Sequence, residues 1–113
     1  MSDGIRKGAP DVRRELFGGR GEVQVWNLLG APAEPFTALL SCELSAGGSV
    51  GRHVQQEFAE VVVGLDGKGE ASVDGRACAL GAGDVVHVPR GAVLAIENQD
   101  DAPLRYLIIK ARV

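Results

Sequence analysis

The sequence of 113 residues is poor in the features that define several large classes of protein. Its two cysteines, Cys42 and Cys78, are too few for a disulfide-stabilised scaffold. No apolar run approaches the length of about 20 residues that a membrane-spanning helix requires. The N-terminal residues carry charges without the apolar stretch of a secretory signal, so we expect a cytoplasmic protein with reduced cysteines. With 12 basic against 15 acidic residues, there is no electrostatic reason to expect nucleic acid or an anionic membrane as a partner.

Glycines, prolines and short apolar segments are what the sequence has in abundance. Sixteen glycines and five prolines separate short runs rich in Val, Leu and Ile, and a hydrophobic content of 45% excludes disorder. A short helix is expected only over residues 10–16, where a proline leads and an acid follows. Strands are expected over residues 22–29, 36–44, 58–65, 69–73, 85–88, 93–97 and 104–112. Asp-Gly pairs between them are typical of hairpin turns, and we therefore predict an all-β fold.

Two of the expected strands, over residues 60–65 and 104–110, are apolar on both faces. A strand buried on both sides lies between two layers, and a closed antiparallel barrel would supply the inner one. In so small a domain a second subunit is the natural outer layer, so we predict a homodimer. The alternative is a flap formed by the N-terminal segment. We treat residues 1–20 as an N-terminal extension and residues 21–113 as a single barrel domain.

A group of polar residues follows Gly47 at defined spacings. Five residues separate Gly47 from His53, Gln55 comes two positions later, Glu60 after four more residues, and Gly67 after a further six. Alternate residues of a strand share a face, so His53 and Gln55 point the same way. Glu60 starts the next strand after a bend, which brings three polar side chains toward one barrel mouth. This pattern resembles the first motif of the cupin family, G-x5-H-x-H-x3-4-E-x6-G.

A second spacing lies further along the chain. Gly83, Pro89, Gly91, Leu94 and Asn98 stand at the positions of the second cupin motif, G-x5-P-x-G-x2-H-x3-N. All the framing residues of this motif are present, but leucine replaces its histidine. Two such patterns in the right order, on a chain of strands, make the resemblance specific.

The resemblance covers residues 47–98 and implies a cupin-type antiparallel β-barrel, a double-stranded β-helix similar to a jelly roll. It also implies a divalent metal such as iron, manganese, nickel or zinc, held by three histidines and a glutamate. The corresponding positions here are His53, Gln55, Leu94 and Glu60. An amide oxygen is a weak ligand for transition metals and leucine is none, so we expect a degenerate site that binds metal weakly if at all.

Two residues outside these positions are further candidates. His87 faces the cavity only if Val85 does, and it faces outward if Val86 and Val88 point inward. Because all three are valines, the sequence leaves the direction of His87 open. Arg90, in the Pro-x-Gly corner, is the best placed arginine for binding a carboxylate. The tentative set of metal ligands is therefore His53, Gln55, Glu60 and His87.

Two classes of function stay open. The first is a non-catalytic barrel that binds a small molecule as a sensor or carrier. The alternative is a metal-dependent enzyme of the dioxygenase, isomerase or lyase type that acts on a small polar substrate. Gln55 and Leu94 favour the first, although a His–Glu pair without metal could still act as acid and base. The predicted site is a cavity for a small, partly apolar ligand, lined by His53, Gln55, Glu60, Leu94 and Arg90.

Overall fold

The computed structural model describes residue 6 and residues 8–112 of the chain. Within these residues the chain forms ten strands and one short 3-10 helix. The elements are β1 (Asp11–Arg14), η2 (Leu16–Gly18), β2 (Glu22–Asn27), β3 (Phe36–Leu44), β4 (Ser49–Val54), β5 (Ala59–Asp66), β6 (Lys68–Val73), β7 (Arg76–Gly81), β8 (Val85–Val88), β9 (Val93–Glu97) and β10 (Leu104–Ala111). The described residues include no helix with the length and hydropathy needed to cross a membrane.

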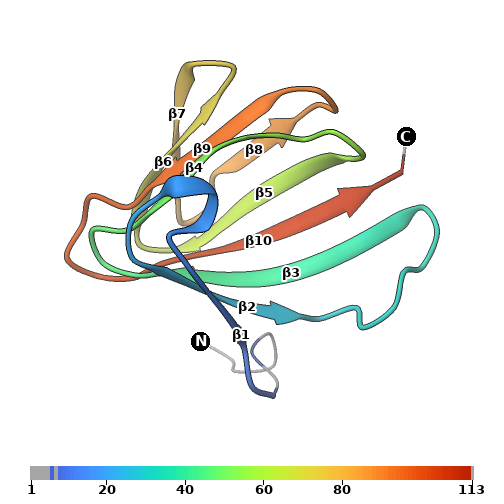
Figure 1. Cartoon of the computed structure of the whole chain (residues 1–113), viewed down its shortest axis with the longest axis horizontal. Helices are drawn as coiled ribbons and strands as arrows, with labels where there is room; N and C mark the ends of the chain where they lie inside the picture. The colour runs from blue at the N-terminus through green and yellow to red at the C-terminus, as the bar shows by residue number, and fades with distance from the viewer. Residues whose placement is uncertain (1–5, 7, 113) are drawn as a thin grey trace.

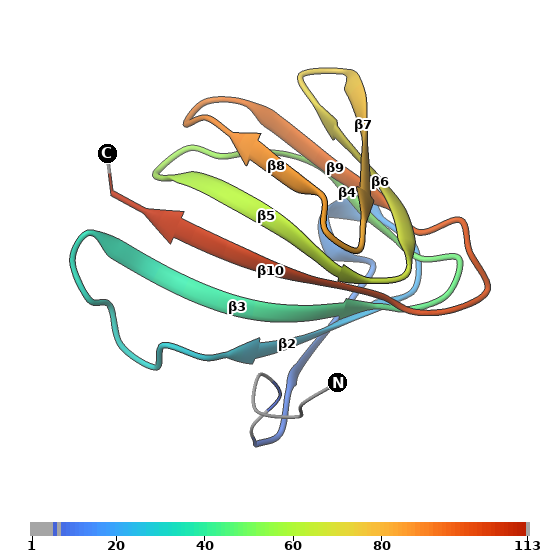
Figure 2. The same ribbon diagram turned by 180° about the vertical axis from the view of Figure 1, so that it is seen from behind.

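The strands form two antiparallel sheets that face each other. One sheet has six strands in the order β1-β2-β3-β10-β5-β8, and the other has four in the order β4-β9-β6-β7. Figures 1 and 2 show the long strands β3, β10 and β5 side by side, with the smaller sheet on the other side of the interior. The predicted antiparallel all-β fold is therefore confirmed.

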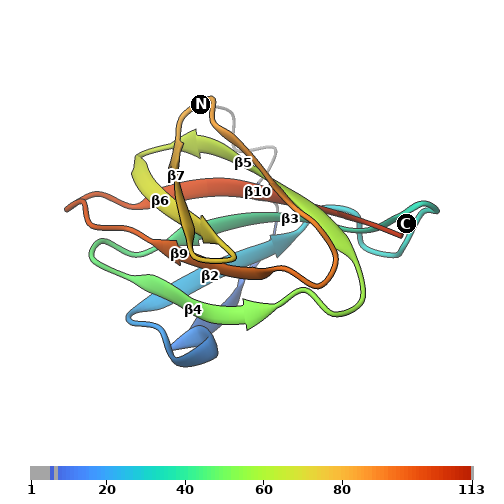
Figure 3. The same cartoon turned by 90° about the horizontal axis from the view of Figure 1, so that it is seen from above.

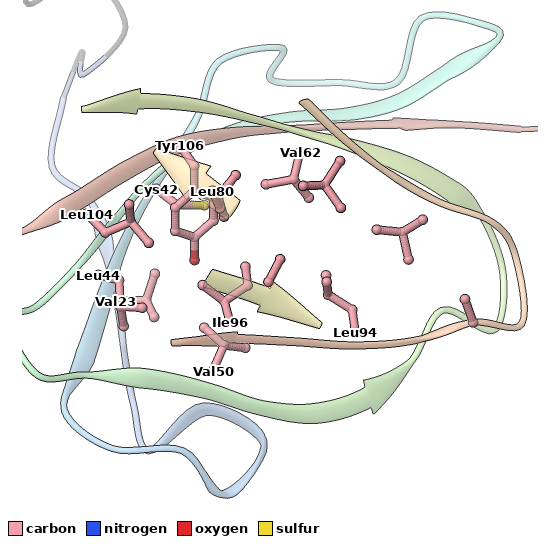
Figure 4. Close-up of a cluster of buried hydrophobic side chains, with 14 residues drawn as sticks. Val23, Cys42, Leu44, Val50, Val62, Leu80, Leu94, Ile96, Leu104 and Tyr106 are labelled. Atoms are coloured by element: carbon pink, nitrogen blue, oxygen red, sulfur yellow. The ribbon is translucent and has the colours of Figure 1, made fainter. Parts of the chain in front are cut away.

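The alternation of side chains along each strand places the core between the two sheets. In β5, Glu60 and Val62 are buried, whereas Val61 and Val63 on the opposite face are half-buried. Figure 4 shows buried side chains from both sheets filling the interior, with Tyr106 directed inward. Burial of this apolar surface is the main stabilising contribution to the fold.

The hairpin between β6 and β7 has the turn that its sequence predicts. Val73 pairs with Arg76, which leaves Asp74 and Gly75 as a two-residue loop. Both loop residues have positive φ, 52° and 81°, as a type I′ turn requires. Asp74 is one of the few non-glycine residue types that enter this region at low cost, and its carboxylate also accepts a hydrogen bond from the Val93 amide at 2.9 Å.

The helix predicted over residues 10–16 is wrong. Its first half is the strand β1, whose Asp11 pairs with Val25 at the edge of β2. The strand ends at Arg14, Glu15 follows with a left-handed φ of 49°, and only the three residues of η2 come next in helical hydrogen bonding. An open sheet edge offered the backbone of this segment better partners than an isolated helical turn could supply.

The segment formed by β1 and η2, which we call the strap (residues 11–18), pairs with β2 through β1 and packs against β4 through η2. Figures 1 and 3 show η2 beside β4. A Cβ atom on Gly51 would lie only 1.8 Å from the carbonyl oxygen of Phe17, and one on Gly19 only 2.1 Å from that of Ser49. The two backbones therefore approach as closely as they do because both positions are glycine.

Candidate functional site

A cavity of about 460 Å³ lies between the two sheets, and Arg13, Leu16 and Phe17 of the strap contribute to its lining. This volume is within the size range of cavities that hold small molecules. Seven polar or charged residues line part of the cavity, but aliphatic and aromatic residues make up most of the lining, with contributions from β2, β3, β4, β9 and β10. Representative side chains are Val23, Val25, Leu40, Val50, Ile96 and Ile108. The lining of the cavity is therefore mainly apolar, with polar side chains on part of it.

The four residues at the cupin ligand positions all line this cavity. His53 and Leu94 are direct partners across the β4–β9 strand pair. Leu94 is 1% exposed and belongs to the hydrophobic core. Gln55 is buried just beyond the end of β4. Its backbone N–H donates to the Ala92 carbonyl oxygen, and its backbone carbonyl oxygen accepts from the Gly91 N–H. The two motifs thus bring their positions together as the family pattern requires, with leucine in place of an imidazole.

His53 is held between its own strand and the strap. Its Nδ1 lies 2.8 Å from the Gly51 carbonyl oxygen, which assigns the proton to Nδ1 in the neutral ring. The ring stacks on Phe17 with centroids 4.0 Å apart and an angle of 11° between planes. Burial lowers the pKa of His53, the bond to Gly51 opposes this, and the charge of Lys110 lowers it further. His53 is therefore a neutral, oriented ring at neutral pH.

Glu60 is the buried carboxylate of the cavity. Its side chain is 1% exposed, and within the described part of the chain neither carboxylate oxygen has a hydrogen-bond partner. Lys110 Nζ lies 3.9 Å from Oε1, which is beyond a good hydrogen bond. Burial raises the pKa of Glu60, and the nearby charge of Lys110 opposes this rise. An acid in this setting is costly to ionise unless a partner approaches.

Two further titratable groups lie deeper, next to Glu60. Burial raises the pKa of Cys42 to about 12, and the Glu60 carboxylate adds to the effect. Tyr106 is fully enclosed, and burial raises its pKa well above the ordinary value, with Cys42 and Glu60 contributing. Both groups are thus uncharged at neutral pH. Cys42 is consequently not a nucleophile, because the thiolate is the reactive form.

His87 and Arg90 are not part of the cavity. Val86 and Val88 are buried in the core, which turns His87 of β8 to the exposed outer face. The tentative inclusion of His87 among the metal ligands is therefore wrong. Two valines gain more from burial than one imidazole, and this sets the direction of the strand. Arg90 is exposed in its corner and lines no part of the cavity, so its predicted place there is also wrong.

The donor set at the cupin position does not fit a tightly held metal. His53 offers one ring nitrogen, Glu60 one carboxylate and Gln55 one amide oxygen, while Leu94 offers nothing. Within residues 6 and 8–112 there is no group of three His, Cys, Asp or Glu side chains placed to hold a metal ion. The stable transition-metal sites of proteins use three or four such ligands.

Lys110, Phe17, Cys42 and Tyr106 line the cavity but were absent from the predicted set. For β10 a signal existed, because Tyr106, Ile108 and Lys110 alternate along one strand and share its inner face. Phe17 carries no such signal, since its position depends on how the strap crosses β4.

Comparisons with known proteins agree with this architecture. The model of the family described as Cupin domain matches residues 40–110. The structure of a predicted oxalate decarboxylase from Thermotoga maritima superposes with a TM-score of 0.89 at 27% identity, covering 96% of both chains. A Cupin 2 conserved barrel domain protein from Salinispora arenicola gives a TM-score of 0.70 at 23% identity, covering 91% of this chain and 82% of that one.

KdgF from Halomonas sp. is also similar, with a TM-score of 0.70 at 14% identity and coverage of 91% and 87% of the two chains. A search of curated proteins gave no match. The family match spans more than half of the chain and includes both motif regions. The chain therefore belongs to the cupin family and has the antiparallel barrel typical of it.

Proposed function

We propose that this cupin binds a small, largely apolar molecule in the barrel cavity, as a carrier or sensor, and does so without a tightly bound metal. The single observation that carries the proposal is the pairing of Leu94 with His53 in a cavity of about 460 Å³. A side chain that would complete a metal site has been replaced by one that enlarges an apolar lining. Apolar enclosure with few oriented polar groups is the usual composition of a small-molecule site.

A metal-dependent enzyme is the alternative, and the similar Thermotoga protein is named as an enzyme, a predicted oxalate decarboxylase. The presence of His53 and Glu60 at the cavity favours it. The apolar part of the lining opposes it, because a small polar substrate would leave any groups that face this part unpaired. Metal content after chelation and reloading with zinc, nickel, iron(II) or manganese separates the two. We expect well under one metal per chain, and a stoichiometric metal would contradict the proposal.

The ligand-binding claim is tested with a neutral probe and a cavity-filling variant. Hexanol should bind the wild-type protein with one site per chain in calorimetric titration. Val25 lines the cavity and is half-buried, so Val25→Phe should fill the space and remove binding. Val85→Phe is the matched control, because Val85 is 65% exposed on the outer face. Equal hexanol binding by wild type and a folded Val25→Phe protein would place the ligand elsewhere.

A further inference from the structure

Two cationic side chains, Arg13 and Lys110, line this cavity, and the less exposed of the two is Lys110. It stands on the inner face of β10, two residues beyond Ile108, and lines the cavity with it. Its side chain is 30% exposed, whereas that of its neighbour Glu60 is 1% exposed. Arg13 also reaches the lining from the strap, but its Nε is engaged by the carboxylate of Asp11.

The two charges of the Lys110–Glu60 pair differ in what they can offer. Both oxygens of Glu60 are closed off from solvent and lack a hydrogen-bond partner among the described residues. Lys110 Nζ carries three donors, and its contact with Glu60 Oε1 at 3.9 Å is too long to satisfy any of them fully. The Lys110 ammonium is therefore the partly exposed member of this pair, while both Glu60 oxygens are closed off from solvent.

We propose that Lys110 anchors an anionic group and that the ligand is an amphipathic monocarboxylate with an aliphatic or aromatic body. This inference rests on the proposed function and names the ligand class of the same cavity. The carboxylate accepts hydrogen bonds from Nζ on its exposed side, and the apolar body lies against the side chains of Val25, Leu40 and Ile108. Charge-assisted hydrogen bonds of this kind are among the stronger ones in proteins.

Other head groups are disfavoured by the same arrangement. A cationic ligand would meet the Lys110 ammonium first and would need to displace it to reach Glu60. A second negative charge on the ligand would approach Glu60 or Glu57, which also lines the cavity. Like charges within a few ångströms repel strongly where water is excluded. A single negative charge on an apolar body takes up the donors of Lys110 and meets less repulsion from Glu57 and Glu60 than a dianion would.

Three probes with eight carbon atoms each test the assignment on the wild-type protein: octanoate, octanol and octylamine. We expect octanoate to bind most tightly in calorimetric titration, about tenfold more tightly than octylamine. Octylamine or octanol binding as tightly as octanoate would overturn the assignment while leaving the cavity-binding proposal standing. If none of the three probes binds and hexanol does not bind either, both proposals are overturned.

Variants locate the anion preference at one residue. Lys110→Met should lower octanoate affinity about tenfold and leave octanol affinity within about twofold, because only the charged contact is lost. Lys110→Arg should retain most of the octanoate affinity. Lys68→Met on the exposed side of β6 is the matched control and should bind octanoate like wild type. Equal loss of octanoate and octanol in Lys110→Met, or no loss of either, would contradict the role of Lys110.

Discussion

Leu94 lies directly opposite His53 across the β4–β9 strand pair. In the cupin pattern these two positions hold imidazoles that share one metal, and here one of them is an alkyl group in the core. Gln55 and Glu60 line the same cavity, so the geometry of the family site persists while its donor set does not. The replacement changes the character of the cavity from coordinating to apolar.

This geometry predicts that metal binding can be restored. The double change Gln55→His with Leu94→His places three imidazoles and one carboxylate around the cavity. We expect it to bind zinc or nickel at least about tenfold more tightly than wild type, because imidazole nitrogen is the better transition-metal ligand. Added metal should also raise its melting temperature by mass action. Calorimetric titration measures the gain.

The control for the restored site is Gln55→Asn with Leu94→Met, which alters the same positions without adding an imidazole. It should bind metal no better than wild type. A folded double-histidine protein with wild-type affinity would mean that the side chains at 94 and 53 do not converge on one point.

Glu60 should make stability depend on pH in a direction opposite to that of most carboxylates. Burial raises its pKa in the folded state, so its favourable contribution is complete below the pKa of an unfolded glutamate, about 4.3, and is lost as pH rises through the higher folded value. Glu60→Gln should therefore stabilise the protein by about 1 kcal/mol at pH 7 and by much less at pH 4.

Urea denaturation at the two pH values measures the effect of Glu60→Gln. Glu70→Gln provides the control, because Glu70 is exposed on β6. The same stability change at both pH values would show that Glu60 is not costly to ionise in the folded protein.

The close approach of the strap to β4 should make Gly51 intolerant of a side chain. The Cβ atom of Gly51→Ala would overlap the Phe17 carbonyl oxygen and force the strap away from His53. We expect a loss of about 1–3 kcal/mol in the free energy of unfolding, as for other overpacked positions. Ala79→Val, which enlarges an exposed residue of β7, should cost far less. Thermal melts that coincide for wild type and Gly51→Ala would contradict the contact.

The outer face of the six-stranded sheet should bind a second copy of the chain. Val61 and Val63 of β5 and Leu107 and Ile109 of β10 form adjacent apolar pairs on this face. We expect light scattering at micromolar concentration to give twice the 11.8 kDa chain mass. Val63→Glu should give a monomer, since a charge in an apolar interface is costly, whereas Ala79→Glu, at an exposed position of the four-stranded sheet, should not. A monomeric wild type would mean that the half-buried face stays in contact with water.

The sequence predicted the part of the molecule that depends on local spacing. Alternation and glycine turns located most strands, and two motifs were enough to place Leu94 in the same cavity as His53. The direction of His87 could not be predicted, because valines on both sides of it gave the strand no polar face. Lys110 was missed because a lysine at a strand end reads as solvated. β7 and the strap were missed because their strand formation depends on edges that exist only in the folded sheet.

The most direct test of the account is the position of a bound probe. Titration of wild-type protein carrying carbon-13-labelled methyl groups with hexanol, followed by NMR, reports which side chains the probe touches. We predict saturable shifts for the methyl groups of Val25, Leu94 and Ile108, which line the cavity, and none for Val12 and Val85, which are exposed. The absence of saturable shifts, or shifts confined to the exposed valines, would contradict the claim that the cavity is a ligand site.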